Sequence, residues 1–268
     1  MSDRLRLAAK HVAHFADRFV APRSGLVVLA YHRVGRSSNL EVDLPVTLFD
    51  TQMARLAEAR CVLDLSEAVA RLAAGEDLSG MVVVTFDDGT ADFAEHAVPI
   101  LECYQVPATL FVATQYIDEQ RSFPDAGKPL SWSTLVDCTS TGLITVGSHT
   151  HTHALLDRVD LRTAAQELDR SIHLLGDQLG RPVEHFAYPK AVPAPPSVES
   201  LVRLRFRSAA LAGTRPNPQG TDVHRLHRSP VQFSDGLDFF ERKLGGGMRL
   251  EDDLRRLLNR RRYVGLSR

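Results

Sequence analysis

The chain has 268 residues, 44% of them hydrophobic, and is long enough to enclose one large α/β core or two small ones. Its formal net charge of -1 shows no basic excess, so we expect no nucleic-acid partner. The three cysteines are scattered and form no CxxC pair, which argues against a disulfide framework or a cysteine-based zinc site and fits a reducing cytoplasm.

A basic amphipathic helix is predicted at the start of the chain, in residues 1–19. Basic residues are interleaved there with apolar ones at helical spacing, and no apolar run is long enough for a signal peptide or a membrane span. We therefore expect a cytoplasmic protein. A helix of this kind can lie on a membrane surface and give peripheral membrane contact, but packing against the domain is the favoured interpretation.

Strand and helix patterns then alternate from residue 26 to about residue 212. Apolar runs bounded by polar breaks predict strands at 26–31, 81–86, 108–112, 142–146, 185–188 and 208–212. Helical patterns are found at 49–60, 65–74, 93–104, 131–140, 161–179, 197–205 and from 235 onward. This alternation indicates βα units around a parallel sheet, and we expect an α/β barrel. No linker divides the chain, so a single domain is predicted.

The end of the second predicted strand, residues 85–89 (TFDDG), carries two adjacent carboxylates, Asp87 and Asp88. Ionised aspartates at the end of a buried strand are costly unless they are solvated, paired or metal-bound. In α/β folds the carboxyl ends of parallel strands are where ligands and catalytic groups collect. This segment therefore predicts a functional site.

A histidine-rich segment, residues 149–153 (HTHTH), follows another predicted strand. Imidazole is the commonest protein ligand for zinc, cobalt, nickel and iron. His149 and His153 are four residues apart, so one turn of backbone can aim both rings at a single ion. With one carboxylate from the aspartate pair they would supply two nitrogens and one oxygen, a set typical of a catalytic metal with open positions. The alternative, a solvated histidine-rich loop, is disfavoured by the aspartates on a neighbouring strand end.

These motifs, in this order, resemble those of the polysaccharide deacetylases, the NodB-homology family also called carbohydrate esterase family 4. The resembling segments are 85–89 with Asp92 and 99–101, then 106–112, 130–132, 148–153 and 186–189. The resemblance covers residues 26–235. It implies a distorted (β/α) barrel of the NodB-homology type. The sequence patterns outside this range predict an N-terminal helix in residues 1–25 and a C-terminal helical extension in residues 236–268.

The resemblance also implies an activity, a cofactor and a set of site residues. The activity is metal-dependent removal of an acetyl group from an N-acetylated amino sugar. Asp88, His149 and His153 would hold one divalent metal, usually zinc, with nickel, cobalt or iron as alternatives. Asp87 would be the general base that takes a proton from water on the metal. His151 points away in a simple alternation and is interpreted as lying outside the ligand set.

Two histidines are candidates for the general acid that protonates the leaving amine. Most family members supply it from a Leu-x-His motif late in the chain, which Leu226-His227 matches only in part, and residues 225–231 look more like a sheet-edge segment. His32, in residues 29–34, lies on a segment that resembles the N-terminal strand of a circularly permuted branch. That branch includes poly-N-acetylglucosamine deacetylases and carries its acid histidine on this strand. We therefore favour His32, with His227 as the alternative.

The third family motif, residues 186–191, departs from the usual pattern at two positions. Ala187 stands where many members have an arginine that orients the catalytic base, although the permuted branch also lacks it. Ala191 stands where glycine is usual, which is unfavourable if that position needs a positive φ. These departures put the fit of the substrate in doubt more than the chemistry.

Substrate contacts are expected from a few residues around these motifs. Tyr188 and Pro189 are candidates in the third motif, together with Lys190. Trp132 is the only tryptophan and can stack on a sugar face, although packing at the start of a helix explains it equally well.

Two late arginines, Arg225 and Arg228, can pair with Asp87 or bind an anionic group of a substrate. Surface or structural pairing is the favoured interpretation.

Two other functions stay open. The same barrel can act on an O-acetyl ester, a formamide or a cyclic imide, or it can be a catalytically silent carbohydrate-binding module. Retention of both aspartates and of the two ligand histidines argues against silence, because a binding module needs no base beside a metal.

Overall fold

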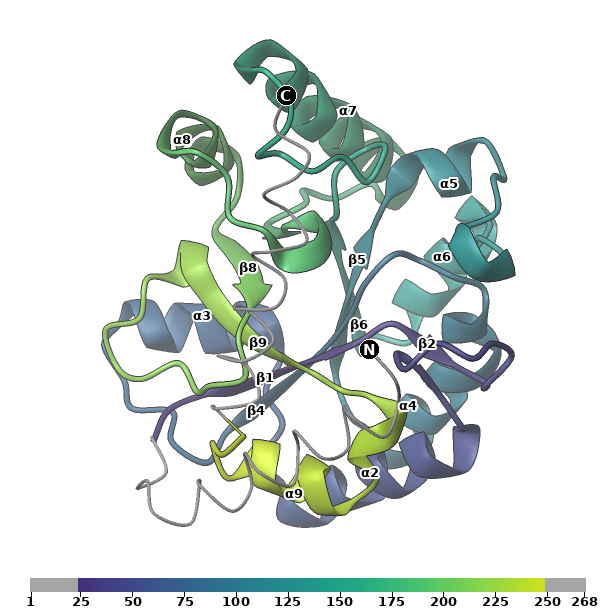
Figure 1. Cartoon of the computed structure of the whole chain (residues 1–268), viewed down its shortest axis with the longest axis vertical. Coiled ribbons are helices and arrows are strands. Elements are labelled where there is room, and N and C mark those ends of the chain that lie inside the picture. The colour runs from purple at the N-terminus through teal and green to yellow at the C-terminus, as the bar shows by residue number, and fades with distance from the viewer. Residues whose placement is uncertain (1–23, 249–268) are drawn as a thin grey trace.

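The computed structural model describes residues 24–248, which fold into a closed barrel of parallel strands surrounded by helices (Figure 1). In order around the barrel the strands are β1 (Val27–Tyr31), β4 (Val82–Phe86), β5 (Ala108–Val112), β6 (Ile144–Ser148), β7 (His185–Ala187), β8 (Ser208–Ala212) and β9 (Leu226–Pro230). Parallel pairing of β9 with β1 closes the ring. The predicted (β/α) barrel is therefore confirmed. The predicted N-terminal helix lies outside the described residues.

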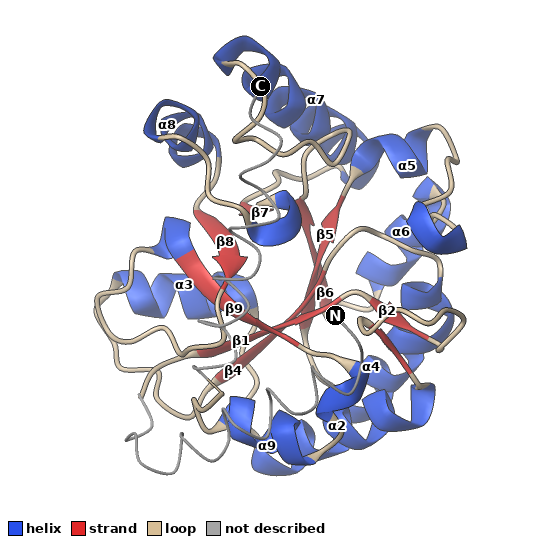
Figure 2. Ribbon diagram, viewed as in Figure 1, coloured by secondary structure: helices blue, strands red, loops and turns tan. Residues whose placement is uncertain are grey.

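Helices and short turns cover the outside of the barrel, as Figure 2 shows. The helices are α2 (Val46–Ala59), α3 (Leu65–Ala73), α4 (Val98–Tyr104), α5 (Thr114–Asp118), α6 (Trp132–Ser140), α7 (Leu161–Leu179), α8 (Pro196–Arg205) and α9 (Asp238–Leu244). Helical turns occur at η1 (Phe93–Ala97), η2 (Pro124–Ala126), η3 (Pro189–Ala191), η4 (Val223–Arg225) and η5 (Phe233–Asp235), and β2 (Arg33–Val34) pairs with β3 (Asp43–Leu44). Within residues 24–248, no helix is long and apolar enough to cross a membrane.

Apolar side chains fill the barrel at the end where its strands begin. Val28, Val83 and Leu226 point inward from β1, β4 and β9 and share one buried cluster with α3, which closes that end. Because successive strand residues point to opposite faces, Val27 and Leu29 belong instead to the larger cluster beneath the surrounding helices. Some polar side chains also face inward at this end, where His185 is hydrogen-bonded to Ser66 of α3 and to Ser208. The inward-facing Asp87 and Arg228 lie instead toward the opposite end, where the strands finish.

The structure differs from the predicted elements in several places. Residues 225–231, expected at a sheet edge, contain β9, which has a hydrogen-bonded strand on each side. The sequence of β9, Leu-His-Arg-Ser-Pro, is too polar to be predicted as a barrel strand, because buried parallel strands are usually apolar. The polar character is tolerated because the inward-facing arginine is buried in an ion pair. The loop after β5 contains the unpredicted helix α5, and the helix predicted over 93–104 begins with the π-helical turn η1.

Candidate active site and metal centre

A cavity of about 350 Å³ lies at the carboxyl ends of the barrel strands. Parallel strands end at one rim, so residues distant in sequence meet there. Among its lining residues are His32 after β1, Asp87 and Asp88 after β4, His149 after β6, then His153, Lys190, and Arg228 on β9. The cavity thus brings together the predicted base, the predicted metal ligands and the favoured acid candidate.

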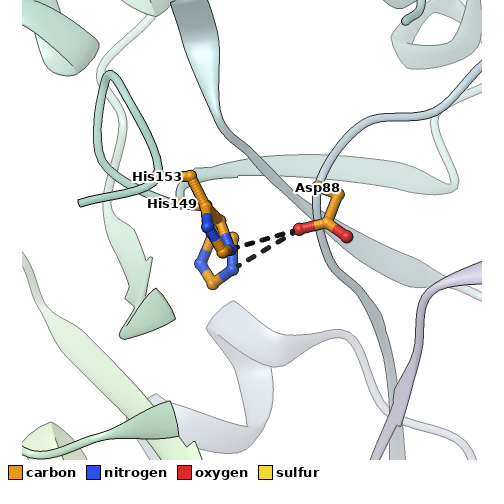
Figure 3. A group of neighbouring side chains, drawn as sticks. All are labelled: Asp88, His149 and His153. Carbon is orange, nitrogen blue, oxygen red and sulfur yellow. Dashed lines mark ion pairs between the residues drawn. The ribbon is translucent and has the colours of Figure 1, made fainter. Parts of the chain in front are cut away.

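Asp88, His149 and His153 form a cluster whose ligand atoms all lie within 4.8 Å of one another (Figure 3). Asp88 Oδ1 is 3.8 Å from His149 Nε2 and 3.5 Å from His153 Nε2. Two imidazole nitrogens and one carboxylate oxygen beside an open cavity are a donor set that fits zinc or a similar divalent metal. The side chains that resemblance to the family implied as ligands are therefore close enough to share one ion.

The His149 ring is oriented by the neighbouring strand β7. Its Nδ1 lies 2.7 Å from the carbonyl oxygen of Ala187, and because a carbonyl only accepts, Nδ1 carries the proton and donates it. Nε2 is the ring nitrogen on the side that faces Asp88. The ring is only 2% exposed, which is incompatible with a solvated loop. Burial, with the nearby His149, lowers the pKa of His153 to about 4, so the His153 ring is neutral and able to bind a metal at neutral pH.

Glu167, on α7, holds the loop between the two ligand histidines. Its Oε2 accepts hydrogen bonds from the backbone N–H of His151 (3.0 Å) and Thr152 (2.8 Å), and its Oε1 accepts one from the Thr152 hydroxyl (2.9 Å). The His151 ring turns aside, with Nδ1 2.9 Å from the hydroxyl of Thr114. Sequence reasoning missed Glu167, whose only signal is an acidic residue on the buried face of an amphipathic helix.

A left-handed turn separates the directions of the two aspartates. Asp88 has a φ of 77° and Gly89 one of 101°, and a non-glycine residue in this region costs about 1–3 kcal/mol. The carbonyl of Asp88 accepts a hydrogen bond from Ala113 N–H at 3.0 Å, which ties the turn to the end of β5. The bend aims Asp88 at the histidines, while Asp87 faces the barrel interior.

Asp87 forms a buried two-point ion pair with Arg228. The two guanidinium Nη atoms donate to Oδ1 and Oδ2 at 2.6 and 2.9 Å, and neither side chain is more than 5% exposed. Burial alone would raise the pKa of Asp87, but Arg228, with His149 and His32, holds it well below its usual range. Asp87 is therefore ionised at neutral pH. The surface or structural pairing favoured from the sequence does not describe Arg228, because its partner lies in the cavity.

His32 faces Asp87 across the cavity. Its Nε2 lies 3.8 Å from Asp87 Oδ2, and its side chain is 27% exposed. Ala30, two residues earlier, lines the same cavity, as expected for alternate residues of a strand. The ring is accessible to a molecule in the cavity and is not a core histidine.

His227, the alternative candidate for the general acid, and Arg225 both lie outside the cavity lining. His227 neighbours Arg228 on β9, so it points to the opposite face of the strand and does not line the cavity. Arg225 pairs with Glu199 at 2.9 Å in an exposed position, as the surface interpretation expects.

Three of the four residues predicted to contact substrate lie outside the cavity lining. Tyr188 is buried, with its ring edge-on to Phe186 at a centroid distance of 4.9 Å, because it alternates with the inward-facing position before it. Pro189 is buried at the start of η3. The indole N–H of Trp132 donates to Asp118 Oδ1 at 3.2 Å, next to the start of α6. Packing therefore accounts for these side chains.

The turn η3 brings the next two residues of the third motif to the cavity. Lys190 and Ala191 have φ values of 51° and 55°. The position of Ala191 thus does require the positive φ at which glycine is favoured. The reshaped turn places a lysine and a methyl group in the cavity lining.

Comparison with known proteins assigns the family. The sequence model of polysaccharide deacetylases matches residues 74–208, about half of the chain. The chain belongs to the polysaccharide deacetylase family. As a member of this family it is a carbohydrate deacetylase. The matched region holds both aspartates and both ligand histidines, whereas His32 and Arg228 join the site only through the fold.

Solved structures similar to this deacetylase cover most of its length. IcaB from Ammonifex degensii is 25% identical, with a TM-score of 0.71 over 83% of this chain and 98% of that chain. The Streptococcus pyogenes deacetylase PplD, in complex with acetate, is 21% identical, with a TM-score of 0.72 over 84% and 99%. A de-N-acetylase from Aggregatibacter actinomycetemcomitans is 16% identical, with a TM-score of 0.69 over 81% and 99%. No curated protein matches the chain in sequence.

Proposed function

We propose that this deacetylase is a metal-dependent hydrolase that removes the acetyl group from an N-acetylated amino sugar. The observation that carries the proposal is the meeting, in one cavity, of a metal-ligand cluster, an arginine-held carboxylate and an accessible histidine. Metal-assisted amide hydrolysis can use all three, because water must be activated and the leaving amine must receive a proton.

Asp88, His149 and His153 would hold the metal, for which we propose zinc, with nickel, cobalt or iron as alternatives. The donor set and the neutral state of the His153 ring support this assignment. A bound divalent cation would supply Lewis-acid polarisation of the acetamide carbonyl and would make water more acidic.

Asp87 is the proposed general base. The Arg228 pair keeps it ionised and fixes its orientation, and each carboxylate oxygen retains a second lone pair that can accept a proton from water. In many family members an arginine at the position of Ala187 on β7 orients the base, and here an arginine on β9, separated from β7 by β8, contacts the base instead. Loss of the usual arginine is therefore compatible with activity.

His32 is the proposed general acid. Its partly exposed ring lines the cavity beside Asp87, where it can donate a proton to the nitrogen of the leaving amine. Histidine suits this role because its ordinary pKa lies near neutrality.

Metal analysis tests the ligand assignment. Protein purified with zinc present is expected to bind about one ion per chain, and His153→Ala to lose it. His151→Ala is the matched control, because it removes a histidine of the same loop that lies outside the cluster, and it should keep the metal. Wild-type protein that binds no divalent metal under any condition would contradict the assignment.

Acetate release from paired N-acetyl and O-acetyl sugars tests the reaction. Asp87→Asn is expected to lower release from N-acetyl sugars by at least ~100-fold while the metal stays bound. His32→Ala should likewise be slow, whereas His227→Ala should behave like wild type. Faster release from the O-acetyl sugars would make the protein an esterase, and loss of activity only in His227→Ala would reverse the acid assignment.

A further inference from the structure

Lys190 is the one lining residue of the cavity whose charge has no partner among residues 24–248. Arg228 is neutralised by Asp87, and Asp88 faces the two ligand histidines. The ammonium of Lys190, in contrast, has no hydrogen bond or ion pair within that range, and the residue is exposed at the cavity. Lys190 is therefore the cation of the cavity lining that is left free to meet an anionic group of a bound molecule.

The backbone holds this lysine in place at an energetic cost. Lys190 and Ala191 are both left-handed, a conformation that glycine adopts without strain and other residues do not. The turn is pinned by a hydrogen bond from Ala191 N–H to the Tyr188 carbonyl at 2.8 Å and by the burial of Pro189. The Tyr188 N–H in turn donates to the Ala210 carbonyl at 3.0 Å, which anchors the turn to β8.

The same strand end positions the metal centre. The Ala187 carbonyl orients the His149 ring, and Lys190 follows three residues later in the chain. Lys190 lines the same cavity as His149 and His153. Lys190 therefore lies at a defined place beside the reaction centre.

We propose that Lys190 selects N-acetylated sugars that carry an anionic group, a carboxylate or a phosphate, next to the acetamide, and rejects those that carry a free ammonium there. The inference rests on the proposed deacetylation. An ammonium close to an anion attracts it at a partly dehydrated rim and repels a second cation, so the lysine discriminates by substrate charge. Because a sugar that has lost its acetyl group is itself cationic, the preference also disfavours chains that are already deacetylated.

The test compares kcat/KM for substrates that differ in charge. Suitable probes are neutral N,N'-diacetylchitobiose, its mono-deacetylated form, N-acetylglucosamine 1-phosphate and a disaccharide of N-acetylglucosamine with glucuronic acid. The last two distinguish phosphate from carboxylate. At low salt, Lys190→Gln is expected to reduce the preference for the better anionic probe over the neutral one by about tenfold, and 0.5 M salt should reduce it in wild type.

Two further variants test whether the effect belongs to the positive charge of Lys190. One keeps that charge in the same turn, and the other removes a positive charge elsewhere on the protein. Lys190→Arg keeps the cation and should preserve the preference, whereas Lys128→Gln removes an exposed lysine outside the cavity lining and should also preserve it. An equal loss on all probes in Lys190→Gln, or an unchanged preference, would overturn the inference.

A binding measurement distinguishes this inference from the proposed reaction. In the Asp87→Asn background, calorimetry with glucosamine 1-phosphate, glucosamine and N-acetylglucosamine 1-phosphate reports charge preference without turnover. Weaker binding of the phosphate compounds on further Lys190→Gln replacement supports the lysine even if no probe is deacetylated. Equal affinities with and without Lys190 would refute it even if wild type releases acetate.

Discussion

Replacing Arg228 by methionine would test whether the proposed base depends on its buried ion pair. Methionine keeps much of the apolar length of the arginine side chain and removes its donors. Asp87, 4% exposed, would lose two hydrogen bonds of 2.6 and 2.9 Å and the opposite charge. The guanidinium also stacks over the Phe111 ring at 5.2 Å, a contact that methionine partly retains.

The loss of stability follows from the burial of both groups. Removing one partner of a buried ion pair costs about 3–5 kcal/mol, since an uncompensated charge is left behind. Burial is the largest influence on the pKa of Asp87 and it remains in the variant, so this pKa should move from well below its ordinary 3.8 to above it. Each unit of that movement corresponds to about 1.4 kcal/mol.

The pH dependence has a defined sign. In wild type the folded-state pKa of Asp87 is lowered, so the pair stabilises the protein above the ordinary pKa and this contribution fades on acidification. In Arg228→Met the folded-state pKa is raised, so folding is favoured by protonation and stability falls as pH rises through that pKa. The difference in unfolding free energy should therefore be largest near neutral pH and smaller near pH ~4.

Urea unfolding of both proteins, with metal removed by a chelator, measures this difference at several pH values. In the holoenzyme the acid limb of kcat/KM should move to higher pH in Arg228→Met, because Asp87 must be ionised to accept a proton. Arg225→Met, which breaks the exposed pair with Glu199, is the matched control and should change stability by less than ~1 kcal/mol. If Arg228→Met lowered the unfolding free energy by less than ~1 kcal/mol and left the acid limb of kcat/KM unmoved, the proposed dependence of Asp87 on its ion pair would be refuted.

Three further predictions concern residues that support the site. Glu167→Ala should weaken zinc binding by about 10–100-fold, measured by competition with a chromophoric chelator, while Glu167→Gln retains most of the affinity because an amide oxygen can still accept the loop N–H groups. Gly147→Ala should lower the unfolding free energy by about 1–3 kcal/mol in a denaturant titration, because its Cβ would lie 2.6 Å from the Phe111 ring and 2.8 Å from the His185 carbonyl oxygen. The buried His185 has its pKa lowered to about 4 by desolvation, so wild type should lose up to ~3 kcal/mol as pH falls from about 6.5 to about 4, and His185→Asn should show a smaller dependence in the same titration.

The sequence by itself determined the local features of this protein. Apolar runs that end in polar residues mark where barrel strands stop, and β5, α7 and β8 begin and end where the patterns predict. Asp88, His149 and His153 were recognisable because each lies directly at or just beyond a strand end, where side chains of neighbouring strands converge. Spacing along the chain and the order of the strands were sufficient to group the two histidines with one carboxylate of the aspartate pair, and the resemblance to the family selected Asp88 as that carboxylate.

Only the tertiary structure decided which distant residues complete the site. Arg228 is 141 positions from Asp87, on a strand too polar to be recognised as part of a barrel, and closure of that barrel brings the two into contact. The barrel also distinguishes the two candidates for the general acid. Side chains alternate along β9, so His227 points away from the cavity, whereas His32, at the end of β1, lines it. The left-handed turn after β7 turns Lys190 inward and leaves the tyrosine before it in the core. Such outcomes depend on register and backbone handedness over the whole ring of strands, which residue types and local spacing do not encode.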